Sequence, residues 1–139
     1  MKSLMSYMAM FLAVAIFTPA LYAQESMEDQ NKRVEKILQL AAQNLKETLK
    51  GSNDNLKESA MEVVRDLKRA YPEAELSRTT IPLMRILRTH SDNNMRILAA
   101  MTLKEIGDEK AFYAIAEAAK FDSSNIVRRI CAGISGTTK

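Results

Sequence analysis

The sequence feature that most constrains the fold is a segment that recurs along the chain. Its fullest copy is MRILAAMTLKEIGD, from Met95 to Asp108, and a shorter copy is VRRICA, from Val127 to Ala132. A fainter copy, LKESA, begins at Leu56. Recurrence at a spacing of some tens of residues is typical of stacked helix pairs, in which neighbouring repeats cover each other's apolar faces.

Residues 1–23 have the pattern of a secretory signal peptide. Lys2 gives a short positive start, residues 4–16 are apolar apart from one serine, and alanines stand at 20 and 23. We expect cleavage after Ala23, with a cut after Ala20 as the alternative. No cysteine lies near the cut, which argues against a lipid-modified protein. The sequence therefore predicts a periplasmic or secreted protein with no membrane contact after cleavage.

An uncleaved anchor is the other interpretation of this segment. About 20 uncharged residues can just span a bilayer, so residues 4–23 could stay attached and tether a component of an envelope complex. We favour cleavage because the helix-breaking Pro19 sits late in the apolar run and the polar Gln24-Glu25-Ser26 follows at once.

Residues 24–139 are long enough for one domain with a core of its own. The whole chain has 20 Lys and Arg against 17 Asp and Glu; without Lys2 the net charge is 19 − 17 = +2. That balance does not favour nucleic acid as a partner. Cys131 is the only cysteine, so packing and not an intrachain disulfide must hold the domain together.

The mature region predicts an all-α fold of six helices in three hairpins. Apolar residues recur at helical spacing, glycine and proline fall between the periodic segments, and no alternating β pattern appears. We expect helices over 29–50, from 54 to Pro72, from Thr79 or Thr80, from 95 to Gly107, after Asp108 and after 122–124. The expected stops are Gly51, a residue that accepts positive φ, and Gly107. The expected N-caps lie in residues 52–54, at Thr79 or Thr80, in residues 91–94 and at Asp108. Each expected helix has an apolar face that we place in the core. In the first two helices these faces are Val34, Ile37, Leu38, Ala41, Leu45 and Leu49, and then Leu56, Ala60, Val63, Val64, Leu67 and Tyr71. In the third and fourth they are Ile81, Leu83, Met84, Ile86 and Leu87, and then Met95, Leu98, Ala99, Leu103 and Ile106. In the fifth and sixth they are Phe112, Ile115, Ala116 and Ala119, and then Ile126, Val127, Ile130 and Cys131.

Residues 80–135 resemble HEAT repeats, in particular the short HEAT-like repeats related to those of phycobilisome lyases. The shared features are an Asp-rich turn, an apolar–Arg–x–x–Ala–Ala–x–x–Leu helix and a Gly-Asp corner. They fall at Asp92, Arg96, Leu103, Gly107, Asp108, Asp122 and Arg128. Residues 34–71 fit loosely, with Lys57 in place of the arginine. The resemblance implies a short right-handed α-α superhelix of about three stacked hairpins, acting as a protein–protein adaptor or scaffold.

Arg96 and Arg128 have two interpretations. Each could pair with a turn carboxylate, Asp92 and Asp122 respectively, and join one hairpin to the next. Each could instead line the concave surface and bind an acidic partner. We favour the structural interpretation because partly buried arginines seek planar, bidentate carboxylate partners.

The residues expected to bind a partner protein lie elsewhere. Arg129 stands about 100° around the helix from Arg128 and is free to face a partner. Ile126 belongs to the last hairpin, residues 108–134, whose apolar face has no following repeat to cover it. We expect this hairpin to associate with itself or with a partner. The full candidate set is Arg65, Arg85, Arg88, Arg129 and Ile126.

The sequence predicts no catalytic, cofactor or metal site. His90 is the only histidine, and a metal site needs converging ligands. Ser91 and Asp92 are too close in sequence to aim at one imidazole, and Cys131 occupies an alanine position as a small buried hydrophobe. A small enzyme or ligand carrier with a pocket between hairpins is the alternative, and it would need convergent polar groups in that pocket.

Overall fold

The computed structural model describes the backbone of residues 2–136 and the side chains of residues 26–136. The chain is 83% helical, with six α-helices and no strand in the described part, which confirms the all-α fold. The elements are α1 (Lys2–Lys50), α2 (Asp54–Ala70), a 3₁₀ turn η1 (Ser77–Thr79), α3 (Thr80–Thr89), α4 (Asn93–Ile106), α5 (Glu109–Phe121) and α6 (Asn125–Ile134).

The chain divides into two units, residues 1–37 and residues 38–139. The expected start of the first helix at Asp29 is wrong: α1 begins at Lys2 and runs through Pro19, and residues 20–50 contain no glycine or proline that would end it. The side chains of the predicted signal segment lie outside the described residues, so its cleavage stays a prediction. Within residues 26–136, no helix has both the length and the apolar character that crossing a membrane requires.

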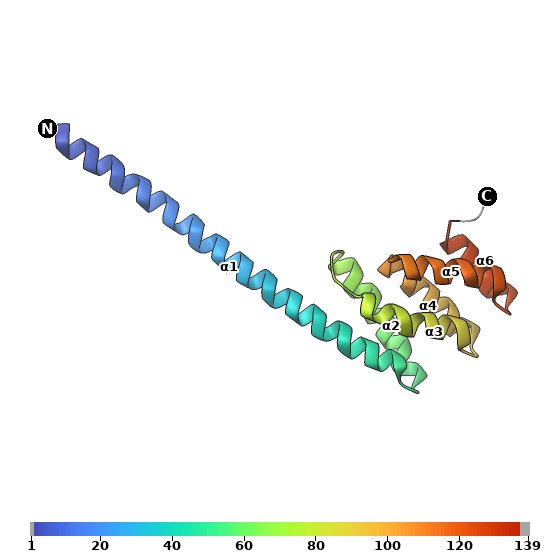
Figure 1. The fold of residues 1–139 in the computed structure, drawn as a ribbon. Coiled ribbons are helices and arrows are strands. Elements are labelled where there is room, and N and C mark those ends of the chain that lie inside the picture. The colour runs from blue at the N-terminus through green and yellow to red at the C-terminus, as the bar shows by residue number, and fades with distance from the viewer. Residues whose placement is uncertain (1, 137–139) are drawn as a thin grey trace. The chain divides into compact units, whose positions relative to one another are not determined.

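The second unit is built of helix pairs that pack on each other. Helix α3 packs against α4, and α5 packs against α6 (Figure 1). Helix α4 also lies against α2 on one side and α6 on the other, while α3 contacts α5. The α2, α4 and α6 helices thus form one layer, and α3 and α5 belong to another. This is the stacked-hairpin arrangement; its right-handed superhelical form stays an expectation.

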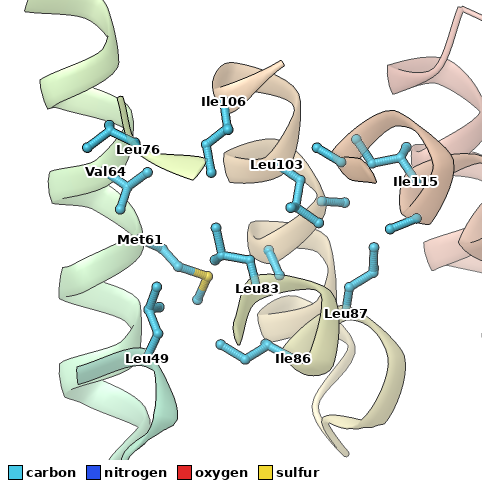
Figure 2. Close-up of a cluster of buried hydrophobic side chains, with 14 of the residues drawn as sticks. Leu49, Met61, Val64, Leu76, Leu83, Ile86, Leu87, Leu103, Ile106 and Ile115 are labelled. Carbon is cyan, nitrogen blue, oxygen red and sulfur yellow. The ribbon is translucent and has the colours of Figure 1, made fainter. Parts of the chain in front are cut away.

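One hydrophobic core runs through these layers. Met61 of α2, Leu83 and Leu87 of α3, Leu103 of α4 and Ile115 of α5 are all fully buried. Figure 2 shows these side chains within one cluster that extends from α2 across α3 and α4 to α5. Because each helix contributes to this shared cluster, no hairpin buries its apolar face alone.

Local signals set most helix ends. The side chain of Asn53 accepts a hydrogen bond from the Leu56 amide at 3.2 Å at the start of α2. Asp92 caps α4, and Asp108 caps α5 by accepting from the Ala111 amide at 2.7 Å. Gly107 ends α4 with φ of 73°, a left-handed conformation that favours glycine. These caps and this stop confirm the sequence predictions.

Two helix ends differ from expectation. Gly51 does not adopt positive φ after α1; a Cβ there would lie 3.2 Å from the Thr48 carbonyl oxygen, so close approach explains the glycine. Neither threonine caps α3 with its side chain. The Thr79 hydroxyl donates to the Leu76 carbonyl, and the Thr80 hydroxyl donates to Asp108 Oδ2 at 2.6 Å. Thr80 therefore ties α3 to the start of α5.

Several residues expected in the core are exposed. On α2, Val63 is exposed while Met61 is fully buried, because the helix turns a slightly different face to its neighbours. On α5, Ala111 and Ala114 are buried and Phe112 is not, since small side chains let the helix approach its neighbours closely. The exposed residues that the pattern had placed inside are Val34, Ile37, Leu56, Val63, Tyr71, Ile81, Phe112 and Ile126.

Candidate functional site

A buried ion pair joins the second hairpin, formed by α3 and α4, to the third hairpin, formed by α5 and α6. Arg96, on α4, donates from Nε to Asp122 Oδ2 at 3.0 Å and from Nη2 to Oδ1 at 3.1 Å. The two side chains are 8% and 6% exposed. Asp122 stands in the turn between α5 and α6, so the bidentate contact bridges the two hairpins. Two parallel charge-assisted hydrogen bonds also fix the orientation of both groups.

The rest of the Arg96 guanidinium is bonded within its own hairpin. Nη1 donates to the carbonyl oxygens of His90 at 2.6 Å and Ser91 at 3.3 Å, and Nη2 donates to Asn93 Oδ1 at 2.7 Å. The expected pairing of Arg96 with Asp92 is wrong, because Asp92 uses its carboxylate to cap α4. The side chain of Arg96 is thus occupied inside the stack and is not offered to a partner.

A second polar contact joins α2 to the turn between α3 and α4. Lys57 Nζ lies 2.9 Å from Asp54 Oδ1, and His90 Nε2 lies 3.2 Å from the same oxygen. The Asp92 amide donates to His90 Nδ1 at 3.1 Å, so Nε2 carries the proton and donates to Asp54. The hydrogen bonds from Lys57 and then from His90 hold the pKa of Asp54 below its ordinary value.

The helices α2, α4 and α6 repeat one arrangement of positions around their N-caps. The N-caps are Asn53, Asp92 and Ser124. The residue directly after the cap is polar in each helix: Asp54, Asn93 and Asn125. The fourth residue after the cap is a cation: Lys57, Arg96 and Arg128. The second residue before the cap is Gly51 in α2, His90 in α4 and Asp122 in α6. In each hairpin the cation binds the side-chain oxygen of the residue after the cap.

Arg128 occupies the cation position of the third hairpin. Its Nη1 donates to the Asp122 carbonyl oxygen and its Nη2 donates to Asn125 Oδ1, which matches the bonds of Arg96 to His90 and Asn93. The expected ion pair of Arg128 with the Asp122 carboxylate is wrong, since Arg96 takes that carboxylate. Within residues 26–136, Arg128 pairs with no carboxylate, and its Nε has no hydrogen-bond partner. The edge formed by its Nε and Nη2 therefore binds Asn125 but no carboxylate of residues 26–136.

A groove of about 300 Å³ lies between α3 and α5. Its side chains are mostly apolar, and two of them are unusually exposed: Tyr113 at 65% and Phe121 at 74%. Arg88 is one of its few charged residues. The lining comprises Met84, Leu87, Arg88, Tyr113, Ala114, Glu117, Ala118, Phe121 and Asp122.

The five residues predicted to bind a partner do not form one cluster. Arg88 lines the groove, and Arg85 is exposed on the same helix. Arg129 and Ile126 are exposed on α6. Arg65 is half-buried on α2, and its Nε is buried with no hydrogen-bond partner in the described part of the chain.

The other cations of α2 are engaged in contacts within the protein. Lys68 Nζ bonds to the carbonyl oxygens of Pro72 and Ala74, and Arg69 lies 3.4 Å from Asp66 and 3.5 Å from Glu105. With Lys57 held by Asp54 as well, the basic side of this helix forms a network of internal contacts.

Sequence reasoning missed two elements of this surface. Tyr113 and Phe121 do not fall on the expected apolar stripe of α5, and only their packing environment shows that they flank a groove. Asn93 and Asn125 did carry a signal, because Asn-x-x-Arg occurs at the start of both recurrent helices. In the described residues, no three His, Cys, Asp or Glu side chains are placed to hold a metal ion.

Cys131 is fully buried in α6, as its alanine-like position predicts. Burial, with a further contribution from the charge of Asp122, raises the pKa of its thiol to about 11. The thiol therefore packs as a small hydrophobic group.

Comparison of the chain with protein-family models, curated proteins and solved structures finds no match. The resemblance to HEAT repeats thus depends on the residues quoted for it, and the stack of helical hairpins defines the class of protein only at the level of an all-α, repeat-like fold.

Proposed function

We propose that this is an exported, non-catalytic HEAT-like repeat protein that binds another protein through its last hairpin, residues 108–134. The observation that carries the proposal is the exposure of large apolar side chains around the α5–α6 turn. Phe121, which ends α5, is 74% exposed, and Ile126, in the first turn of α6, is 50% exposed. Rings and branched side chains of this size gain the most free energy when a partner covers them.

The groove between α3 and α5 extends this surface. Phe121 and Tyr113 both line it, and Arg88 adds a positive charge at its side. Aromatic residues and arginine are the types most enriched where protein partners meet. A partner that covered the α5–α6 turn could place an apolar side chain in this groove.

Export is the second part of the proposal. Residues 1–23 would direct secretion and be removed after Ala23, which leaves residues 24–139 in the periplasm or outside the cell. Intact-mass measurement of the exported protein tests this directly. The expected mass is that of residues 24–139. A mass that includes residues 1–23 would contradict cleavage and support the membrane-tethered form.

Site-specific photo-crosslinking tests the binding proposal. A photoreactive residue would be introduced at Phe121 or at Ile126 in the full-length chain, in the cells that make the protein. Leu56 is the matched control, because it is 55% exposed and apolar but lies on α2. We expect one discrete adduct from positions 121 and 126 and a weaker or absent adduct from position 56. Equal adducts at all three positions, or no adduct at any of them, would contradict the proposal that the last hairpin binds a partner.

The mass of the adduct also distinguishes a second protein from a second copy of this chain. An adduct of twice the chain mass would show self-association through the same hairpin. Sedimentation velocity of the purified protein over a range of concentrations would then give the oligomeric state.

A further inference from the structure

We propose that Arg128 and Asn125 bind the carboxylate of an acidic residue that a partner protein presents at the N-terminal turn of a helix. That carboxylate would take the place on Arg128 that Asp122 takes on Arg96. This inference depends on the proposed function, because it names the chemistry of the partner at the same hairpin.

The first argument is the match between the two arginines. Arg96 and Arg128 each donate from Nη1 to the carbonyl oxygen two residues before an N-cap and from Nη2 to the asparagine after that cap. The same two nitrogens of each guanidinium thus bond to acceptors at the same two positions around the N-cap. The edge formed by Nε and Nη2 is the edge with which Arg96 holds Asp122. On Arg128 the same edge has no carboxylate in the described chain.

The second argument is the chemistry of this edge. An arginine fork that is already oriented loses little side-chain entropy when a carboxylate binds, and the planar pair is bidentate. Arg128 is half-buried beside the fully buried Val127 and Cys131, so a carboxylate there would be partly shielded from water. Shielding strengthens a charge-assisted hydrogen bond. Arg129, exposed on the next position, adds positive charge that favours an acidic segment.

The third argument concerns what presents the carboxylate. Asp122 reaches Arg96 from the second position before the N-cap of α6, and His90 reaches Asp54 from the second position before the N-cap of α4. Both junctions are thus made by the turn that leads into a helix. A partner that continued the stack would place its own turn against Arg128.

A second copy of this chain does not supply that group from its first hairpin. The corresponding position before the N-cap of α2 is Gly51, which has no side chain. In the register that Arg96 and Asp122 show, head-to-tail stacking of two copies would place Gly51, and no carboxylate, opposite Arg128. The occupant is therefore a different protein, with Asp or Glu in the turn before a helix.

The experiment measures the photo-adduct formed from position 126 in the full-length chain with three substitutions of basic residues in the last hairpin. Arg128→Gln removes the charge and the fork, and Arg128→Lys keeps the charge without the fork. Lys120→Gln is the matched control, because Lys120 is an exposed cation of α5. We expect adduct yield to fall about 10-fold in Arg128→Gln, less in Arg128→Lys, and little in Lys120→Gln. Thermal melts of each purified variant report whether the fold is kept.

Mapping the adduct completes the test. The crosslinked peptide of the partner should contain an acidic residue in a turn before a helix, and replacing that residue with its amide should lower the yield as Arg128→Gln does. An unchanged yield in Arg128→Gln and Arg128→Lys would overturn this inference and leave the proposed function standing. Loss of the adduct in Lys120→Gln alone would overturn it as well. Absence of any adduct with the native arginines would overturn both proposals.

Discussion

The guanidinium of Arg96 and the carboxylate of Asp122 form a bidentate ion pair, at 3.0 and 3.1 Å, between two neighbouring hairpins of the stack. Both side chains are almost fully buried. Low exposure makes this contact sensitive to the loss of either partner, because the group left behind would be charged, desolvated and unpaired.

We predict that Arg96→Met strongly destabilises the protein. The substitution leaves the Asp122 carboxylate buried without its cation, which typically costs about 3–5 kcal/mol. Urea unfolding followed by circular dichroism would measure the change. Arg69→Met is the control: that side chain is 57% exposed in its contacts with Asp66 and Glu105, so its loss should cost under about 1 kcal/mol. Similar unfolding midpoints for the two variants would contradict a structural role for Arg96.

We predict that Leu103→Ala lowers the free energy of unfolding by about 2–5 kcal/mol. Leu103 is fully buried in the cluster shared by the hairpins, so truncation removes apolar contacts and leaves a cavity. Thermal and urea unfolding measure the effect. Met101→Ala, on the same helix with 42% of the side chain exposed, should cost much less. Coincident melts of Leu103→Ala and the native protein would show that the helix register is wrong.

We predict that part of the stability is lost in acid through Asp54. The pKa of Asp54 is lowered in the folded state by Lys57 and His90, so the unfolded state takes up a proton first as the pH falls. The stabilisation is fully present above the pKa of Asp54 in the unfolded chain, about 4, and is lost as the pH falls through the lower pKa of the folded state.

Thermal melts between pH 7 and pH 3 test this effect. Asp54→Asn should be less stable than the native protein at pH 7 and should converge with it as the pH approaches 3. Asp66→Asn is the control, because Asp66 is 76% exposed and its partner, Arg69, lies on the same helix. A constant difference between Asp54→Asn and the native protein over the whole pH range would refute the prediction.

We predict that Cys131 reacts slowly with thiol reagents in the folded protein. With a thiol pKa of about 11, only about one thiol in a thousand is ionised at pH 8, and the side chain is fully buried. Reaction with a disulfide reagent should be slow in buffer and fast in 6 M guanidinium. The reaction rate of free cysteine in the same buffer gives the reference for an unprotected thiol. Equal rates with and without denaturant would show that α6 does not bury this thiol.

The sequence alone predicted the features that depend on neighbouring residues. The caps Asn53, Asp92 and Asp108 and the stop at Gly107 follow from bonds and backbone angles within one turn of helix. The recurrent Arg-x-x-Ala helices likewise predicted the stacked pairs. Burial of Leu103 and Cys131 also followed from their places in the repeated pattern.

Only the tertiary structure decided which faces meet and which polar groups pair. Periodicity placed Val63 and Phe112 inside, but the approach of neighbouring helices buried Met61 and Ala111 instead. The sequence favoured Asp92, in the turn before α4, as the partner of Arg96. The observed partner is Asp122, which lies 26 residues further along the chain. Such choices depend on distances between segments that are remote in sequence. A helical pattern determines the side of a helix that is apolar, while the rotation of that helix and the partners of its charged groups are set by packing.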